Sequence, residues 1–273
     1  MIVDFHSHTY ESDGTLSPQA LADFMGERRV EIFSISDHDT LSAYGKFEPK
    51  NGARVVTGME INTTYRENEV HILGYGVKLD HAPLLEMMER NRSARRVRAQ
   101  RMVDQLRAAG YSITLADIER EATDAKAFGR PHVAKALIRL GQVPDVDYAF
   151  RHLLTHGKPG YVPSLYVTPA GAIEAIKAAG GIPVLAHPGR LKDRSLIEHL
   201  IEQGVEGLEV FYPKHDAEDR AAFKATAERH GLVMTAGNDF HDIRYHTYGV
   251  GMGVERGDIA AFLERVIELP AGP

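Results

Sequence analysis

Residues 1–8 read Met-Ile-Val-Asp-Phe-His-Ser-His, and this segment predicts both a fold element and a chemistry. Its apolar residues predict a buried first strand over residues 2–5. Side chains repeat every two residues along a strand, so the imidazoles of His6 and His8 point in the same direction. Two neutral imidazoles that converge at the end of a strand can bind one metal ion.

Short apolar runs alternate with helical patterns through most of the chain. Strands are also predicted at residues 32–36, 55–57, 69–75, 183–186, 207–211 and 232–236. Helices are predicted at residues 17–28, 169–179, 195–202 and 217–230. This alternation is typical of a parallel α/β sheet or barrel. Polar residues recur at the carboxyl ends of the strands, which favours a barrel over an open sheet.

Residues 80–160 break this alternation and are predicted to be almost wholly helical. The expected helices cover residues 82–109, 115–122, 132–140 and 146–156. We therefore expect a barrel formed by residues 1–79 and 161–273, with a helical insertion at residues 80–160 that contributes to substrate binding. Seven arginines between Arg90 and Arg107 allow either a phosphate- or RNA-binding stripe or a solvated helix face. The solvated face is favoured, because apolar residues supply an opposite side.

The composition excludes several classes of protein. The chain has 273 residues and a net charge of −6, which argues against a general nucleic-acid coat protein but allows a local basic pocket. The absence of cysteine excludes disulfides and thiolate metal sites, and fits a reducing cytosol. No apolar run approaches the roughly 20 residues that span a bilayer. We expect a cytoplasmic protein with no membrane partner and no obligate protein partner.

Histidines or carboxylates lie on or directly after six of the predicted strands. One histidine at a strand end is usually a hydrogen-bonded structural residue, but six such segments are hard to explain by packing. The candidate ligands are His6, His8, Asp13, His38, Glu60, His71, His187, Asp239 and His241. Nitrogen and oxygen donors suit Zn²⁺, Mn²⁺ or Fe²⁺. Nine ligands are too many for one ion, so we expect two or three ions that share a bridging carboxylate, an arrangement suited to hydrolysis.

The order of the motifs His-x-His, Ser-Asp-His-Asp, Gly-x-Glu, His-Ile-Leu-Gly, Ala-His-Pro and Asp-x-His resembles the PHP family, named for polymerase and histidinol phosphatase. The resemblance covers almost the whole chain. It implies a distorted (β/α)7 barrel with three ions, Mn²⁺ foremost. The implied ligands are His6, His8, Glu60 and Asp239 for the first ion, Glu60, His71 and His187 for the second, and Asp13, His38 and His241 for the third.

Two motifs in the insertion narrow the resemblance. Residues 128–137 and 156–162 resemble the branch that removes phosphate from 3′,5′-nucleotide bisphosphates, in which related enzymes trim nucleotides from the 5′ ends of short RNA. Pro131 is expected in a first helical turn, so Arg130 and His132 would flank an anion-binding helix N-terminus. Arg130 offers a bidentate fork and Lys158 a point charge. The other candidate substrate contacts are Arg190, Tyr212 and His215. Each of these residues could instead be a surface cation or a helix cap.

The expected function is hydrolysis of the 3′-phosphate of a 3′,5′-nucleotide bisphosphate, such as adenosine 3′,5′-bisphosphate, by a hydroxide held between two ions. The proton donor stays open between His132, His215 and a metal-bound water. Three alternatives remain: a 5′-to-3′ exonuclease on short RNA or DNA, a histidinol-phosphate phosphatase, and a non-catalytic domain. The expected partner is a small phosphorylated nucleotide, with short RNA second. His81, His152, His156, His199, His230 and His246 are expected to be solvent-exposed residues without a catalytic role.

Overall fold

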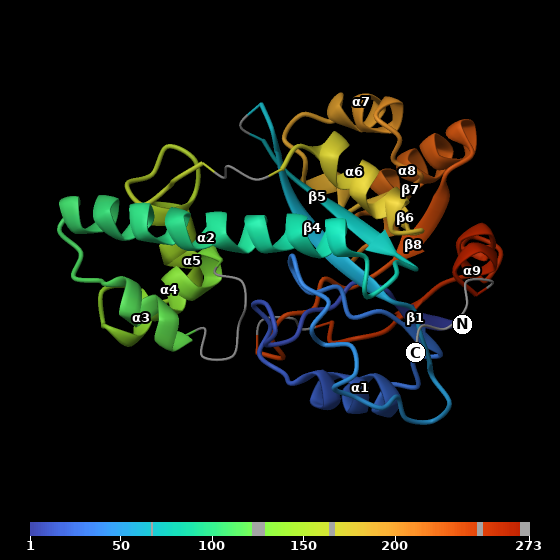
Figure 1. Ribbon diagram of the computed structural model, residues 1–273, viewed down its shortest axis with the longest axis horizontal. Coiled ribbons are helices and arrows are strands. Elements are labelled where there is room, and N and C mark those ends of the chain that lie inside the picture. Colours follow the sequence, from blue (N-terminus) through green and yellow to red (C-terminus); the bar gives the residue numbers. More distant parts are fainter. Residues whose placement is uncertain (67, 122–128, 164–166, 245–247, 268–273) are drawn as a thin grey trace.

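Two β-sheets organise the computed structural model, which describes residues 1–66, 68–121, 129–163, 167–244 and 248–267 (Figure 1). The first sheet has the order β3-β2-β1-β9. Its strands are β1 (Ile2–Asp4), β2 (Ile32–Phe33), β3 (Arg54–Val55) and β9 (Met252–Gly253). The second sheet has the order β4-β5-β6-β7-β8. Its strands are β4 (Gly58–Tyr65), β5 (Asn68–Tyr75), β6 (Ile182–Leu185), β7 (Gly207–Phe211) and β8 (Val233–Ala236).

The predicted distorted (β/α)7 barrel is not confirmed, because the described strands form two mixed sheets and no closed barrel. β4 pairs antiparallel with β5, and β5 pairs antiparallel with β6. The two sheets approach each other where the amide of Phe5 donates to the carbonyl of Ala236 at 2.8 Å, and at isolated bridges between Ser7 and Phe240 and between His38 and Glu60. The α/β class and the predicted strands are confirmed, but the antiparallel hairpin was not anticipated.

The sequence did not predict strands β4 and β9, and of the two only β4 carries a predicted ligand, Glu60. Six consecutive residues of β4, Gly58 to Thr63, are buried, and they include polar Glu60 and Asn62. A strand that buries both faces lacks the alternation of polar and apolar residues that marks a half-buried strand. Its polar residues face the site rather than solvent, so hydrophobic patterning could not reveal it.

Four of the helices outside the insertion begin close to where the sequence predicted them, and the last, α9, was not predicted. They are α1 (Pro18–Glu27), α6 (Pro169–Ala178), α7 (Leu196–Glu202), α8 (Ala217–His230) and α9 (Ala260–Ile267). The side chains of Ser17, Thr168 and Asp216 accept hydrogen bonds from the first free amides of α1, α6 and α8. Such caps satisfy donors that have no partner inside the helix. Local sequence therefore sets where these helices start.

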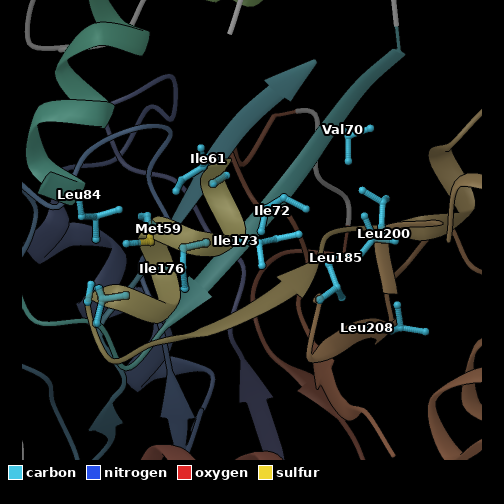
Figure 2. Close-up of a cluster of buried hydrophobic side chains, with 14 of the residues drawn as sticks. Met59, Ile61, Val70, Ile72, Leu84, Ile173, Ile176, Leu185, Leu200 and Leu208 are labelled. Atoms are coloured by element: carbon cyan, nitrogen blue, oxygen red, sulfur yellow. The ribbon is translucent and has the colours of Figure 1, made fainter. Parts of the chain in front are cut away.

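A large hydrophobic cluster packs helices against the second sheet (Figure 2). Ile61 and Ile72 on β4 and β5 lie beside Ile176 of α6, and all three are fully buried. Burial of such side chains contributes about 1.5–3 kcal/mol each. On another face, Phe262 of α9 packs edge-on to Phe5, with ring centroids 4.8 Å apart. These contacts fix β4 and β5, which carry Glu60 and His71, and the segment after β1, which carries His6.

Among the described residues, the four helices between β5 and α6 extend away from the sheets in Figure 1. They are α2 (Ala82–Ala108), α3 (Leu115–Glu121), α4 (Arg130–Arg139) and α5 (Val146–Ala149), and a π-helical turn follows at Phe150–Leu154. Their apolar side chains form a separate cluster. The domain limits at residues 80 and 160 stay a prediction. Among the described helices, none combines the length and apolar character needed to cross a bilayer.

Candidate metal centre

The nine predicted ligands converge at one end of the two sheets. Their donor atoms form three groups, and within each group these atoms lie within 4.8 Å of one another. The groups are His6, His8, Glu60 and Asp239; Glu60, His71 and His187; and His8, Asp13, His38 and His241. Glu60 belongs to two groups, as the resemblance implied. His8 also belongs to two, which the sequence did not suggest.

The first group has the dimensions of a metal site. The Nε2 atoms of His6 and His8 each lie 3.4 Å from Glu60 Oε2 and 3.4 Å from Asp239 Oδ1. Donors at about 2.1 Å from a tetrahedral ion are separated by roughly 3.4 Å. Both Nε2 atoms are buried without a hydrogen-bond partner. Buried polar atoms are costly unless they are satisfied, so these residues fit a cation held between them.

The other two groups flank the first. Glu60 Oε1 lies 2.7 Å from His71 Nδ1 and 3.2 Å from His187 Nε2. Asp13 Oδ1 lies 3.3 Å from His241 Nε2, and Asp13 Oδ2 lies 3.8 Å from His38 Nε2. Two carboxylates therefore stand at the centre of two clusters of imidazoles.

Charge and burial oppose each other throughout this centre. Burial alone would raise the pKa of Glu60, but the imidazoles of His71, His38 and His6 hold that pKa well below its ordinary value. Burial alone would lower the pKa of His241, but Asp13 and Asp239 raise it to about 9. Burial lowers the pKa of His187 to about 3. The carboxylates are thus held ionised, which is the state that binds cations.

Three of the six described non-glycine residues with positive φ lie at or beside the predicted ligands. His187 has φ 31° and Asp239 has φ 54°, and Asp39, next to His38, has φ 51°. Residues other than glycine adopt this left-handed region at a cost of about 1–3 kcal/mol. The strand-end turns that present the predicted ligands are therefore over-determined by the surrounding packing.

Glu209 supports the centre and was missed by the sequence analysis. It is fully buried on β7; its Oε1 accepts from Nδ1 of His6 at 2.9 Å and its Oε2 accepts from the amide of His187 at 2.8 Å. A carboxylate behind a metal-binding histidine fixes the ring and its tautomer. The available signal was a single acid inside the apolar strand Gly-Leu-Glu-Val-Phe.

Two further buried aspartates position the loops. Asp4 accepts from the amides of His6 and Asn238, at 3.2 and 3.1 Å. Asp37 accepts from the amide of Thr9 at 2.7 Å and from its hydroxyl at 2.6 Å, and thereby holds the segment that leads to Asp13. Neither aspartate belongs to the three groups of predicted ligands.

A main cavity of about 340 Å³ opens over the centre. Six cations line it: Arg95, Arg98, Arg130, Lys135, Arg190 and Lys214. Arg95 and Arg98 belong to α2 and are buried, with exposed fractions of 4% and 8%. The favoured interpretation of the α2 arginines as a solvated face is wrong for these two, because Arg95 pairs with Asp39 and Arg98 pairs with Glu69.

A side cavity of about 260 Å³ adjoins the main cavity, and both are lined by Glu69, His71, Arg130 and Arg190. The other residues around the side cavity include Asn68, Thr155, His156 and Tyr161. His156 is exposed, as expected, but it lies at this cavity rather than on a remote surface.

The six predicted substrate contacts are distributed unevenly. Arg130 and Arg190 line both cavities, where Arg130 pairs with Glu69 and Arg190 donates to Asp239 Oδ2 at 3.1 Å. Tyr212 is buried, and its hydroxyl donates to the same oxygen at 3.2 Å. Lys158 is exposed and is not among the residues that line either cavity.

The two predicted substrate histidines have structural partners. Nδ1 of His132 accepts from the amide of Gly129 at 3.1 Å and so caps α4. His215 is buried; its Nδ1 donates to the carbonyl of Val210 at 3.0 Å and its Nε2 accepts from the amide of Gly189 at 3.1 Å. Both ring nitrogens of His215 are therefore engaged within the protein. Phe128 of the same motif lies outside the described residues.

Comparisons with known proteins agree with this geometry. No family model matches the chain. A 3′,5′-nucleoside bisphosphate phosphatase of Chromobacterium violaceum is 34% identical over 247 residues, which cover 88% of this chain and 87% of that protein. The 5′-3′ exoribonuclease Rnm of Escherichia coli is 33% identical over 251 residues, with 88% and 85% covered. The structure of an amidohydrolase from Chromobacterium violaceum with bound sulfate superimposes with a TM-score of 0.84 at 32% identity, covering 93% of this chain and 92% of that one.

Proposed function

The chain belongs to the PHP family of phosphoesterases, and we propose that it hydrolyses the 3′-phosphate of 3′,5′-nucleotide bisphosphates such as adenosine 3′,5′-bisphosphate. It is an enzyme that hydrolyses phosphoesters, and its relatives are named as a phosphatase and an exoribonuclease. This substrate is supported by the relative named 3′,5′-nucleoside bisphosphate phosphatase, which is 34% identical over most of both chains. Two or three divalent ions serve as cofactors, with Mn²⁺ the first candidate and Zn²⁺ or Fe²⁺ the alternatives.

The observation that carries the proposal is the charge of the main cavity. The chain as a whole has a net charge of −6, yet six cations line this one cavity beside the predicted metal ligands. Of the acidic residues that line it, Asp13, Glu60 and Asp239 are predicted ligands, which leaves Glu69 and Asp242. Such a cavity suits a substrate with one phosphate at the ions and a second phosphate at the cations.

The ions would be held by the three groups of ligands given above. When bound, they would supply Lewis-acid stabilisation of the phosphoryl oxygens and a water of lowered pKa. Glu209 orients His6 and the turn at His187. Arg190 and Tyr212 both donate to Asp239 Oδ2 and so hold this carboxylate toward the site. Arg130 stands where it can exchange Glu69 for a substrate phosphate.

The test is metal analysis of the purified protein followed by measurement of phosphate release. Arg130→Ala should lower kcat/KM for adenosine 3′,5′-bisphosphate by about 10- to 100-fold, because a charged hydrogen bond contributes roughly 1.5–3 kcal/mol. The same variant should change hydrolysis of p-nitrophenyl phosphate by less than about threefold. Arg139→Ala is the matched control, since Arg139 lies on the same helix and pairs with Asp117 and Glu121. Equal losses on both substrates would contradict a role for Arg130 in binding the second phosphate.

A 5′-to-3′ exonuclease activity on short RNA is the second candidate. The similarity to the Escherichia coli exoribonuclease favours it, and the side cavity next to the main cavity provides room for a larger substrate. Release of mononucleotides from short oligonucleotides, faster than release of phosphate from the bisphosphate, would favour this candidate over the first.

A further inference from the structure

The side cavity differs in chemistry from the main cavity. One wall is formed by His71 and His187, which the second ion would share. The lining also includes Asn68, Thr155 and an aromatic pair, His156 and Tyr161. The side cavity therefore offers π surface, an amide and a hydroxyl beside the cations Arg130, Arg190 and Lys192.

The two aromatic side chains are close enough to act together. The ring centroids of His156 and Tyr161 are 5.3 Å apart, and the rings are inclined at 61°. His156 is exposed and Tyr161 is half-buried, so their surfaces remain accessible from the cavity that they line. Stacking of a nucleobase on an aromatic side chain contributes about 1–3 kcal/mol, and it tolerates any base.

The loop that carries the pair is held in one conformation by its own backbone. The amide of Lys158 donates to the carbonyl of Thr155 at 3.0 Å, and the amide of Tyr161 donates to the carbonyl of Lys158 at 3.0 Å. A Cβ atom on Gly160 would lie 2.7 Å from Cδ2 of Leu106, so this loop is pressed against α2. Tyr161 is thus positioned before any ligand binds, which reduces the entropic cost of binding.

We propose that His156 and Tyr161 form the subsite for the nucleobase of the substrate. This inference rests on the proposed function, because a 3′,5′-nucleotide bisphosphate carries three groups on one ribose: two phosphates and a base. The structure offers three matching regions around Arg130 and Arg190: the predicted ion centre, the cations of the main cavity and the aromatic side cavity. Asn68 and Thr155 lie where they can hydrogen-bond to the edge of the base.

The experiment compares a ligand with a base and a ligand without one. Dissociation constants of AMP and ribose 5-phosphate are measured by calorimetry on the metal-loaded protein. Wild-type protein should bind AMP at least about tenfold more tightly, and Tyr161→Leu should weaken AMP binding about 10- to 100-fold. Binding of ribose 5-phosphate should stay the same, and Tyr161→Phe should retain the preference for AMP.

A second aromatic pair in the same insertion provides the control. Tyr148 and His152 also have adjacent rings, 4.4 Å apart, but they do not line either cavity. Tyr148→Leu should bind both ligands as the wild type does. His156→Ala tests the same subsite at an exposed residue, where the fold tolerates truncation. It should also reduce the preference for AMP.

The outcomes separate this inference from the proposed function. The subsite is wrong if wild-type protein binds neither ligand or binds both equally. It is also wrong if the Tyr161 and His156 variants fold but keep the preference for AMP. A preference for AMP that Tyr161→Leu abolishes supports the subsite even if the wild type releases no phosphate from adenosine 3′,5′-bisphosphate, in which case only the proposed reaction fails.

Discussion

Glu60 is the residue around which the candidate centre is arranged. Its two carboxylate oxygens face different groups of imidazoles: Oε1 faces His71 and His187, and Oε2 faces His6 and His8. It is fully buried on β4, where an unpaired charge would be strongly destabilising. The surrounding imidazoles keep it ionised, so one side chain can bridge two predicted ion sites.

The carboxylates around His241 also predict how metal binding depends on pH. The pKa of His241 in the metal-free protein is about 9, because Asp13 and Asp239 outweigh burial. Its protonated form pairs with these carboxylates. This pairing fully stabilises the metal-free protein at pH values below about 6.5, the ordinary pKa of histidine, and the stabilisation is lost as the pH rises through 9. An ion must displace this proton before it can use the ring.

We therefore expect the apparent affinity of the group containing Asp13, His38 and His241 for Mn²⁺ to rise with pH up to about 9, by roughly tenfold per pH unit for each proton displaced. Calorimetric titrations between pH 6 and pH 9, in two buffers of different ionisation enthalpy, measure both the affinity and the protons released. His241→Asn should remove the pH dependence due to this residue. An affinity that is constant over this range would contradict the prediction.

At the scale of elements, the turn after β8 is packed too tightly for an added Cβ atom. Gly237 follows β8, and a Cβ atom there would lie 2.3 Å from Cβ of His6 and 2.8 Å from Oε1 of Glu209. The close approach of β8 to β1 thus requires glycine at this position. This close approach brings Asp239 within 3.4 Å of His6 and His8, which follow β1.

Gly237→Ala should accordingly separate His6 from Asp239, lower the free energy of unfolding by about 1–3 kcal/mol and reduce the bound metal. Chemical denaturation and metal analysis measure these effects. Gly253→Ala on β9 is the matched control, because no atom lies within 4 Å of its added Cβ, and it should leave both quantities nearly unchanged. If Gly237→Ala retains full metal content and stability, β1 and β8 are not packed as described.

The long helix α2 connects the helical insertion to the candidate metal centre. Nε and Nη2 of Arg95 each lie 2.9 Å from Oδ2 of Asp39, and Nδ2 of Asn91 donates to Oδ1 of Asp39 at 2.8 Å. Asp39 directly follows His38, so the buried ion pair between Arg95 and Asp39 connects the helix to the third group of predicted ligands. Loss of one partner of such a pair is strongly destabilising, because the other charge stays buried.

For the whole molecule, metal binding should be a large part of stability. Nine titratable side chains, mostly buried, meet at one place, and several of their donor atoms have no hydrogen-bond partner. Mn²⁺ at 100 times its dissociation constant should stabilise the folded state by about 2.7 kcal/mol, which raises Tm by roughly 5–10 °C.

Calorimetry of the EDTA-treated protein, before and after addition of Mn²⁺, measures this shift in Tm. Asp239→Asn removes one ligand of the first group and should show a smaller shift than the wild type. Glu206→Gln is the control at a half-buried position next to β7, where the carboxylate pairs with Lys177 and Arg265 away from the three groups, and it should show the full shift. The absence of any shift in the wild-type protein would argue that the three groups do not bind ions.

The sequence by itself determined the class of fold, most strands and helices, and the nine residues that converge at the candidate centre. These were readable because strand ends, helix caps and the spacing of His6 and His8 are local properties. The tertiary structure alone decided that the strands form two mixed sheets, that Arg95 and Arg98 are buried, and that both ring nitrogens of His215 have partners within the protein. It also revealed Glu209, which contacts His6 across 203 residues of sequence. The physical reason is that burial and hydrogen-bond partners depend on contacts between segments far apart in the chain, whereas residue type and spacing are properties of the local sequence.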